Sequence, residues 1–377
     1  MERDAIMAFT VPRLTSWVVD IAEATRNYEG WLAQRVPMLR GDIELKHRRM
    51  ADDLFSFLRA TFYRWAQVWP EVCSDLCGAP RVLGVGDLHV ENFGTWRDAE
   101  GRLIWGVNDF DEAVGLEYTN DLVRLCTSAQ IAIDESRLAL SGRRACEAVL
   151  EGYIESLRAG GGEVVLAERH RWLRDLAVAR LKDQRIYWDR LRSLRTVSGR
   201  VDAGVRRLLE NALPERRLDF RVVHRQAGLG SLGRQRLTAL AQWRGGTIAR
   251  EAKPLTVSAW LWGRNAPEVA PRYAELLARA VRVPDPFLQL HARWLVRRLA
   301  PDCSRIELES LPQGRDERKL LWMMGWEAAN IHLGSRAQRQ AILRDLGRRK
   351  AGWLTQAAER MCEVSALDWR KWNKSAR

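Results

Sequence analysis

The stretch that decides the fold reads GDLHVEN at residues 86–92, and it follows the strand-like run from Arg81 to Val85. Asp87 and Asn92 stand five residues apart within it. A carboxylate at the first position can accept a proton from an attacking hydroxyl group, and an amide at the second can reach a Mg²⁺ ion. Because a short loop after a strand fixes both groups in one place, this spacing indicates a site for group-transfer chemistry.

A second acidic motif, VNDFD at residues 107–111, ends another strand-like run. In protein kinases, an Asp on a strand–turn after the catalytic loop ligates Mg²⁺ and is followed by Phe. Asp109 fits that position, and Asp111 stands where Gly is usual. We therefore predict Asp109 as the main Mg²⁺ ligand, with Asn92 second. Asp111 or Glu112 offers a further acid, either for a second ion or for support.

The spacing of these residues leaves a second interpretation open. Asp and Asn are common turn formers after strands, and two acidic clusters with His89 in one of them also suit a metal hydrolase. Two roles are open for His89, a catalytic one and a hydrogen bond that braces the loop, and we favour the second.

A glycine-rich motif, GLGSLG, occupies residues 228–233 and matches the pattern G-x-G-x-x-G. Dinucleotide-binding folds share this pattern, but there the loop leads from a strand into a helix. Here the next apolar run, Leu237 to Trp243, ends in two glycines and leads to another strand-like run, Thr247 to Leu255. The context therefore predicts a hairpin that covers a nucleotide. The expected nucleotide-binding residues in it are Gly228, Gly230, Ser231 and Gly233.

Lys253 lies twenty residues past Gly233, on the third of these strand-like runs. Kinases place a strand Lys at about this distance, where it holds the α- and β-phosphates of ATP and pairs with a Glu of the next helix. Glu268 and Glu275 lie in the helical stretch that follows, and we expect Glu275 to pair with Lys253. Glu251 shares the face of Lys253, since residues two apart on a strand point the same way.

The chain divides near residue 214, where long helical patterns give way to strand-like runs. We expect a helical lobe over residues 1–214, a smaller sheet-containing lobe over 215–310, and helices over 311–377 that pack back on the helical lobe. The first lobe would carry the catalytic loop and the metal-binding Asp, and the second the glycine-rich loop and Lys253.

Composition limits the classes of function. The net charge is +13, which favours an anionic partner such as a nucleotide. No single block of Lys and Arg stands out, so we do not expect a nucleic-acid role. No run of about 20 apolar residues occurs, so we predict no membrane span. Cys73 and Cys77 have no second pair that would complete a zinc site, and the expected location is cytoplasmic. Oligomeric state is not indicated.

These motifs, together with DLVRL at residues 121–125 and REAK at 250–253, resemble the bacterial family catalogued as domain of unknown function 2252. That family is grouped with kinase-like proteins. The early motifs also look like those of aminoglycoside and choline phosphotransferases, where G-D-x-H-x-x-N precedes I-D-F or I-D-W. The resemblance spans nearly the whole chain, and it implies that Asp121 is a buried acid that braces the catalytic loop.

The order of the motifs differs from that of ordinary kinases, because the catalytic loop precedes the glycine-rich loop. Circular permutation explains this order, since chain ends that lie close together can be joined and new ends opened. The expected fold is therefore α+β and protein-kinase-like: two lobes, circularly permuted, with a large helical lobe and a small antiparallel sheet. Residues 295–299 would form the strand that leads to the hinge, and 322–332 the helix that normally precedes the catalytic loop.

The expected function is an ATP- and Mg²⁺-dependent phosphotransferase, with Asp87 as the base that positions the acceptor hydroxyl. The acceptor, a small molecule or a protein, is not indicated. A nucleotide-binding pseudokinase-like module and a nucleotidyl transferase of the same fold remain alternatives, and a nucleic-acid-binding protein is a weaker one.

Overall fold

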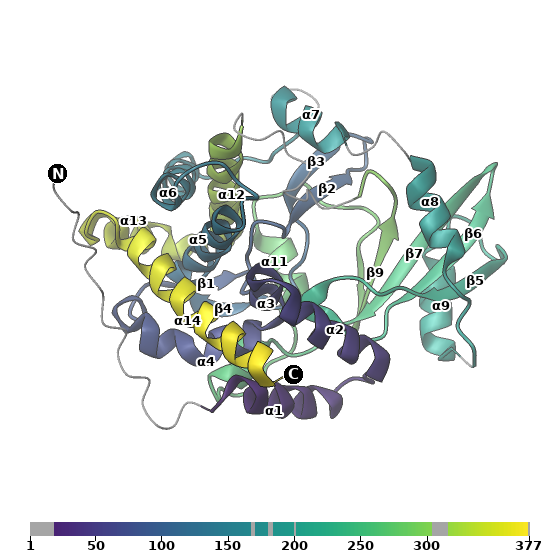
Figure 1. Ribbon diagram of the computed structural model, residues 1–377. Coiled ribbons are helices and arrows are strands. Elements are labelled where there is room, and N and C mark those ends of the chain that lie inside the picture. Colours follow the sequence, from purple (N-terminus) through teal and green to yellow (C-terminus); the bar gives the residue numbers. More distant parts are fainter. Residues whose placement is uncertain (1–18, 167–169, 180–183, 200, 304–315, 376–377) are drawn as a thin grey trace.

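The computed structural model describes residues 19–166, 170–179, 184–199, 201–303 and 316–375. The expected extended run from Leu295 to Ile306 is therefore described only as far as Cys303. The described chain is a mixed α+β structure, with helices gathered on one side and a five-stranded sheet on the other (Figure 1).

The helical side is built from both ends of the chain. Its helices are α1 (Ile21–Ala33), α2 (Arg40–Asp52), α3 (Leu54–Ala60), α4 (Phe62–Val72), α5 (Tyr118–Asp134), α6 (Gly142–Ala159), α12 (Glu317–His332), α13 (Arg339–Arg348) and α14 (Trp353–Ser375). All of them except α2 contribute to one apolar core, and α14 runs along α5 and the N-terminal helices (Figure 1). Among the described helices, none combines the length and the apolar character that crossing a membrane requires.

Helices α6 and α12 approach unusually closely because glycine stands at the contact. A Cβ on Gly152 would lie 1.9 Å from the carbonyl oxygen of Trp322, and one on Gly325 would lie 1.9 Å from that of Val149. Any larger residue would push the helices apart. This packing fixes α12 beneath the loops of the site.

Two short two-stranded sheets carry the acidic motifs. Strand β1 (Arg81–Gly84) pairs antiparallel with β4 (Val114–Glu117), and β2 (Phe93–Arg97) pairs antiparallel with β3 (Leu103–Val107). The loop from β1 to β2 contains Asp87 and Asn92, and the loop from β3 to β4 contains Asp109. The two pairings therefore bring both loops to the same place.

The larger sheet is antiparallel throughout, in the order β5-β6-β7-β9-β8. Its strands are β5 (Phe220–His224), β6 (Leu237–Trp243), β7 (Gly246–Pro254), β8 (Gln289–His291) and β9 (Trp294–Leu299). The glycine-rich motif joins β5 to β6, and Lys253 lies on β7 opposite Leu295 of β9. The predicted hairpin after the glycines is confirmed by the β6–β7 pairing.

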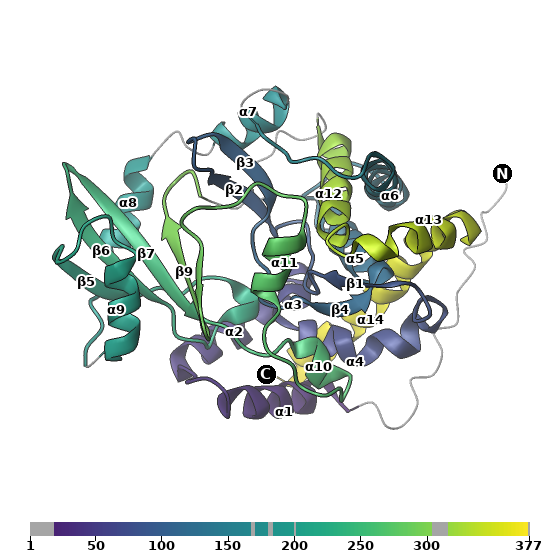
Figure 2. The ribbon, with the colours of Figure 1, turned by 180° about the vertical axis from the view of Figure 1, so that it is seen from behind.

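Each face of this sheet has its own helix. Helix α9 (Ala203–Asn211) contributes Leu209 to the cluster under one face, and α8 (Gln184–Ser193) contributes Leu191 to the cluster under the other. Both helices precede residue 214, where the expected boundary lay, yet they pack with the sheet. The remaining helices are short: α7 (Arg171–Ala179), α10 (Ala259–Gly263) and α11 (Tyr273–Arg279). Figure 2 shows α11 between the sheet and the helical side.

Candidate functional site

The loop after β1 is held by a buried acid. Asp121, on α5, is fully buried and accepts the backbone N–H groups of Val85 at 2.7 Å and Gly86 at 2.8 Å. Gly86 has a φ of +82°, and a side chain there would meet the carbonyl of Glu112. The bracing role that the family resemblance implied for Asp121 is therefore present in the structure.

A chain of buried side chains supports that acid from behind. Nε2 of His332, at the end of α12, lies 2.9 Å from Oδ2 of Asp121, and Nδ1 of His332 lies 2.8 Å from the hydroxyl of Tyr153 on α6. All three side chains are essentially inaccessible. The helix expected beneath the Asp87 loop thus reaches the loop through His332 and Asp121.

Asp87 points into the site and is held by one arginine. Nε of Arg124 donates to Oδ1 of Asp87 at 2.7 Å, while Nη2 of Arg124 donates to the carbonyl of Leu58 at 2.8 Å. Burial raises the pKa of Asp87 above its ordinary value, and the guanidinium of Arg124 offsets part of this effect. A carboxylate of raised pKa and fixed direction is suited to accept a proton.

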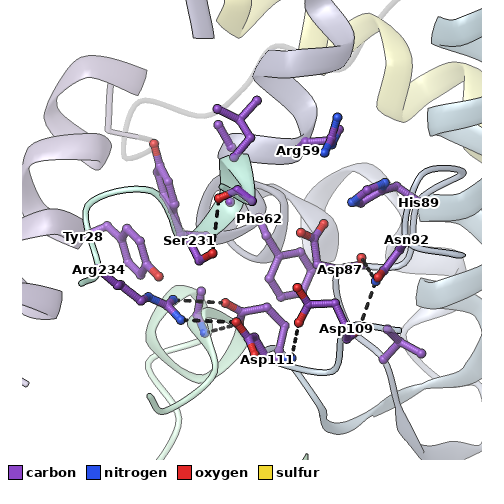
Figure 3. A pocket seen from close by; sticks show the side chains of 18 residues that line it. Tyr28, Arg59, Phe62, Asp87, His89, Asn92, Asp109, Asp111, Ser231 and Arg234 are labelled. Carbon is purple, nitrogen blue, oxygen red and sulfur yellow. Dashed lines mark hydrogen bonds and ion pairs between the residues drawn. The ribbon is translucent and has the colours of Figure 1, made fainter. Parts of the chain in front are cut away.

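Asn92 ties the two acidic loops together. Its Nδ2 donates to the backbone carbonyl of Asp87 at 3.1 Å and to that of Asp109 at 3.2 Å, which leaves the amide oxygen as a possible metal ligand (Figure 3). His89 also lines the pocket, and its Nδ1 accepts the backbone N–H of Glu91 at 3.2 Å. This is a contact of the loop-bracing kind that we favoured for His89.

Lys253 joins the sheet to the acidic loops. Its Nζ lies 3.1 Å from Oδ1 of Asp109 and 2.7 Å from Oδ1 of Asp111, and the lysine is only 2% exposed. A buried ammonium needs such partners, because an unpaired charge in the interior is costly. One cation already bridges this pair of carboxylates, so the pair is arranged to hold positive charge.

The same donors fit a Mg²⁺ ion. Mg²⁺ is typically bound by one or two carboxylates, with phosphate oxygens and water completing its shell. Asp109 and Asp111 supply two carboxylates, and Asn92 supplies an amide oxygen. Among the described residues, no group of three or more His, Cys, Asp or Glu side chains is placed to hold a metal ion.

The glycine-rich loop lies directly over Asp87. A Cβ on Gly230 would be 3.0 Å from the carbonyl oxygen of Arg59 and 3.5 Å from Oδ2 of Asp87. Leu229 and Leu232 of the loop are buried in a cluster with side chains of α2, α3 and α14. The loop is thus anchored to the helical side, in contact with the catalytic-loop candidate.

The resulting pocket is small and polar (Figure 3). Its cavity volume is about 50 Å³. Four acids line it, together with two arginines, aromatic side chains and the glycine-rich loop. The residues of that lining are Tyr28, Arg59, Ala60, Phe62, Tyr63, Val85, Asp87, His89, Asn92, Asp109, Asp111, Glu112, Gly228, Leu229, Gly230, Ser231, Arg234 and Ala259. Of the predicted nucleotide-binding glycines, Gly228 and Gly230 line it; Gly233 instead accepts a backbone hydrogen bond from Leu39.

The expected pairing of Lys253 with Glu275 is wrong. Glu275, on α11, accepts hydrogen bonds from Arg272 at 2.7 and 2.8 Å and pairs with Arg279 at 3.0 Å, because these arginines lie one turn away on the same short helix. Lys253 pairs instead with Asp109 and Asp111, which lie on the loop between β3 and β4. Glu251, on the same face of β7, is also engaged elsewhere.

Glu251 is the centre of a buried arginine cluster. Oε2 accepts from Arg225 at 2.7 Å, and Oε1 accepts from Arg236 at 3.1 Å and from Arg297 at 2.9 Å. Burial opposes ionisation of Glu251, but the three guanidinium groups together hold its pKa well below its ordinary value. Arg236 also donates to the hydroxyl of Ser231, so this cluster supports the glycine-rich loop.

Several residues of the site were not identified from the sequence. Arg124 carried a signal, because it stands three residues after Asp121 on one helix and so shares its face. Arg234 directly follows the last glycine of the loop. Tyr28 and Arg59 reach the pocket from helices far away in sequence, and no local pattern marks them.

Comparison with known proteins gives one finding. Residues 35–186 match the model of a family described as an uncharacterized protein conserved in bacteria (DUF2252). The match covers less than half of the chain. It includes Asp87, Asn92, Asp109 and Asp121, and it ends before the glycine-rich loop and Lys253. No curated protein and no solved structure matches the chain.

Proposed function

We propose that the protein is an ATP- and Mg²⁺-dependent phosphotransferase with a circularly permuted, protein-kinase-like fold. The observation that carries the proposal is the meeting of two distant groups of residues at one pocket. The glycine-rich loop and Lys253 come from the five-stranded sheet, and Asp87, Asn92 and Asp109 come from the loops of the helical side.

The order of elements along the sheet supports the kinase-like part of the proposal. From β5, the chain runs through the glycine-rich loop, a hairpin, Lys253 on the third strand, and helix α11, which is the order of glycine loop, strand Lys and αC in kinases. Strands β8 and β9 and then helix α12 follow. If the ends were joined, the catalytic-loop candidate would come after these elements, beyond α13, α14 and helices α1 to α4. The first and last described helices, α1 and α14, contact each other, as such a joining requires.

Each residue of the pocket then has a role in the transfer. Asp87, fixed by Arg124, accepts the proton of the acceptor hydroxyl. Asp109 and Asp111, with the amide oxygen of Asn92, would hold Mg²⁺, which neutralises charge on the phosphate oxygens. Lys253 holds phosphate oxygens on the sheet side, and the glycine-rich loop covers them and excludes water.

The pocket must open to admit a nucleotide. Ligand pockets for molecules of that size usually measure roughly 300–1,000 Å³, whereas this one offers about 50 Å³. We assign the opening to the glycine-rich loop, because it forms the cover over Asp87; the movement would have to release Leu229 and Leu232, which are buried in the closed state. The structure would thus represent a closed state of the proposed enzyme.

Incubation with ATP and Mg²⁺ tests the proposal and separates its alternatives. ATP labelled at the γ-phosphate and ATP labelled in the adenine ring are compared in parallel, with a panel of hydroxyl acceptors and with the protein alone. Transfer or release of the γ-label supports the phosphotransferase. Binding without turnover supports the pseudokinase-like module, and attachment of the adenine label supports nucleotidyl transfer. A chain that neither binds nor consumes ATP would contradict the proposal.

A further inference from the structure

Arg234 is a buried cation that the proposed reaction has not yet used. It directly follows the glycine-rich loop, lines the same pocket as Asp87, and is 3% exposed. Its Nη1 lies 3.8 Å from Oδ2 of Asp111, and its Nη2 lies 3.8 Å from Oε1 of Glu112 (Figure 3). These separations are too long for hydrogen bonds.

Two donors of this guanidinium lack an acceptor. Nε and Nη1 of Arg234 make no hydrogen bond to any described residue, although both atoms are buried. A buried charged donor without a partner costs free energy. An arginine held in this state at the wall of a polar pocket is therefore arranged to meet an acceptor that enters the pocket.

The other cations around the pocket are already paired. Lys253 contacts Asp109 and Asp111, Arg124 contacts Asp87, and Arg59 contacts Glu91. Arg234 differs from them because two donors of its planar fork, Nε and Nη1, make no hydrogen bond to any described residue, although Tyr28 also interacts with its guanidinium. Such a fork matches the oxygen atoms of a phosphate group, to which it can donate two parallel hydrogen bonds.

The size of the pocket agrees with a phosphate-sized ligand. A cavity that holds a single water molecule needs a volume of roughly 10–15 Å³. The volume of this pocket is about 50 Å³. The space is thus larger than one water requires and much smaller than a nucleotide requires. It lies between Asp87, the proposed base, and Asp111, a proposed metal ligand.

We infer that Arg234 binds the phosphoryl group that is transferred, and so forms an anion subsite between the glycine-rich loop and the two acidic loops. This assignment rests on the proposed function, because it names the part of the substrate that the arginine contacts. The guanidinium would hold the terminal phosphoryl oxygens while Asp87 acts on the acceptor. It would therefore discriminate ATP from ADP, which lacks that group.

Calorimetric titration tests the subsite with three ligands: inorganic pyrophosphate, Mg–ATP and Mg–ADP. Arg234→Gln removes the charge and the fork, and Arg234→Lys keeps the charge but not the fork. Arg244→Gln, at an exposed arginine in the β6–β7 turn, is the matched control. Thermal melting of each variant shows whether it is folded. If Arg234→Gln does not fold, Arg234→Lys still provides the test.

We expect Arg234→Gln to weaken pyrophosphate and Mg–ATP by about tenfold or more, as the loss of a charge-assisted hydrogen bond implies, and to change Mg–ADP by less than about twofold. Arg234→Lys should fall between the wild type and Arg234→Gln, and Arg244→Gln should match the wild type. Equal weakening of Mg–ATP and Mg–ADP would overturn the assignment.

Pyrophosphate separates the two levels of the proposal. If the wild type binds pyrophosphate through Arg234 but binds no Mg–ATP, the anion subsite stands and the phosphotransferase proposal fails. If the wild type does not bind pyrophosphate, or if Arg234→Gln and Arg234→Lys bind it as the wild type does, the subsite itself is overturned.

Discussion

The ammonium of Lys253 lies 3.1 Å from a carboxylate oxygen of Asp109, although 144 residues separate them in the chain. Lys253 comes from the middle of the five-stranded sheet, and Asp109 comes from the turn between β3 and β4. This contact joins the two sides of the molecule at the candidate site. In the proposed enzyme, it is the point at which the cation and the phosphate would meet.

Replacing Lys253 by Met should make the protein's stability depend on Mg²⁺. Without the ammonium, Asp109 and Asp111 repel each other in a buried place, so the melting temperature should fall. Mg²⁺ can take the place of the ammonium between these carboxylates. Addition of Mg²⁺ should therefore raise the melting temperature of Lys253→Met more than that of the wild type.

Lys319→Met is the control for this change, because Lys319 is an exposed lysine on α12 that pairs with Asp316. Its melting temperature should stay within the small range of surface substitutions. An identical response to Mg²⁺ in Lys253→Met and the wild type would mean that Asp109 and Asp111 do not form a cation site.

Replacing Asp87 by Asn should separate binding from turnover. The amide oxygen of Asn can still accept the hydrogen bond from Arg124, but it cannot take a proton from an acceptor. We expect Mg–nucleotide affinity to stay within about threefold and the transfer rate to fall by roughly 10²–10⁴, the usual contribution of a general base. Transfer at the wild-type rate in Asp87→Asn would remove Asp87 from the mechanism.

Replacing Asp121 by Asn should destabilise the protein, because Asp121 holds the loop that carries Asp87. Asp121 accepts three hydrogen bonds, from Val85, Gly86 and His332, and Asn exchanges one acceptor oxygen for a donor. One buried N–H then loses its acceptor, which costs about 1–3 kcal/mol. Urea denaturation measures the loss. Asp134→Asn, at an exposed position of the same helix, should cost almost nothing, and equal losses in the two variants would argue against the bracing role.

The free energy of unfolding should decrease as the pH rises, because Glu327 is protonated in the folded protein at low pH. Burial raises its pKa to about 7, from an ordinary value of 4.5, although Arg282 and Asn330 oppose the shift. Between these values the folded protein holds a proton that the unfolded chain releases, so stability is full below pH 4.5 and declines towards pH 7. The slope from this one group is at most about 1.4 kcal/mol per pH unit.

Glu327→Gln, which cannot titrate, provides the test of that slope. Denaturation at intervals from pH 5 to pH 8 should show a shallower decline in the variant than in the wild type. Parallel curves for the two proteins would show that Glu327 is ionised in the folded state across this range.

Many residues of the site could be predicted from the sequence, because each motif lies within a short stretch of the chain. The spacing of Asp87 and Asn92, the Asp–Phe pair and the glycine-rich hairpin each arise within a few residues, and periodicity marks the strands that carry them. Lys253 was placed by its distance from the glycines. That these segments meet at one pocket was expected only through the resemblance and the permuted order.

The features that could not be predicted from the sequence depend on contacts between distant segments. The pattern from Leu166 to Leu213 indicates one long helical region, but α8 and α9 are separate helices. Between them, the backbone N–H of Val197 donates to the carbonyl of Val222 on β5. Strand β2 forms because β3 lies beside it, and its own sequence did not mark it as a strand. Glu275 pairs with Arg272 and Arg279, which are its neighbours in sequence, and not with Lys253.

Titration of Mg–ATP into the wild type, Asp109→Asn, Lys253→Met and the double variant tests the central claim most directly. Residues that act at one site are coupled, whereas distant, independent residues have additive effects. A single nucleotide site predicts that each substitution weakens Mg–ATP binding at least about tenfold and that the double variant loses clearly less than the sum of the two. Additive losses, loss in only one of the two single variants, or no Mg–ATP binding by the wild type would contradict a shared kinase-like site.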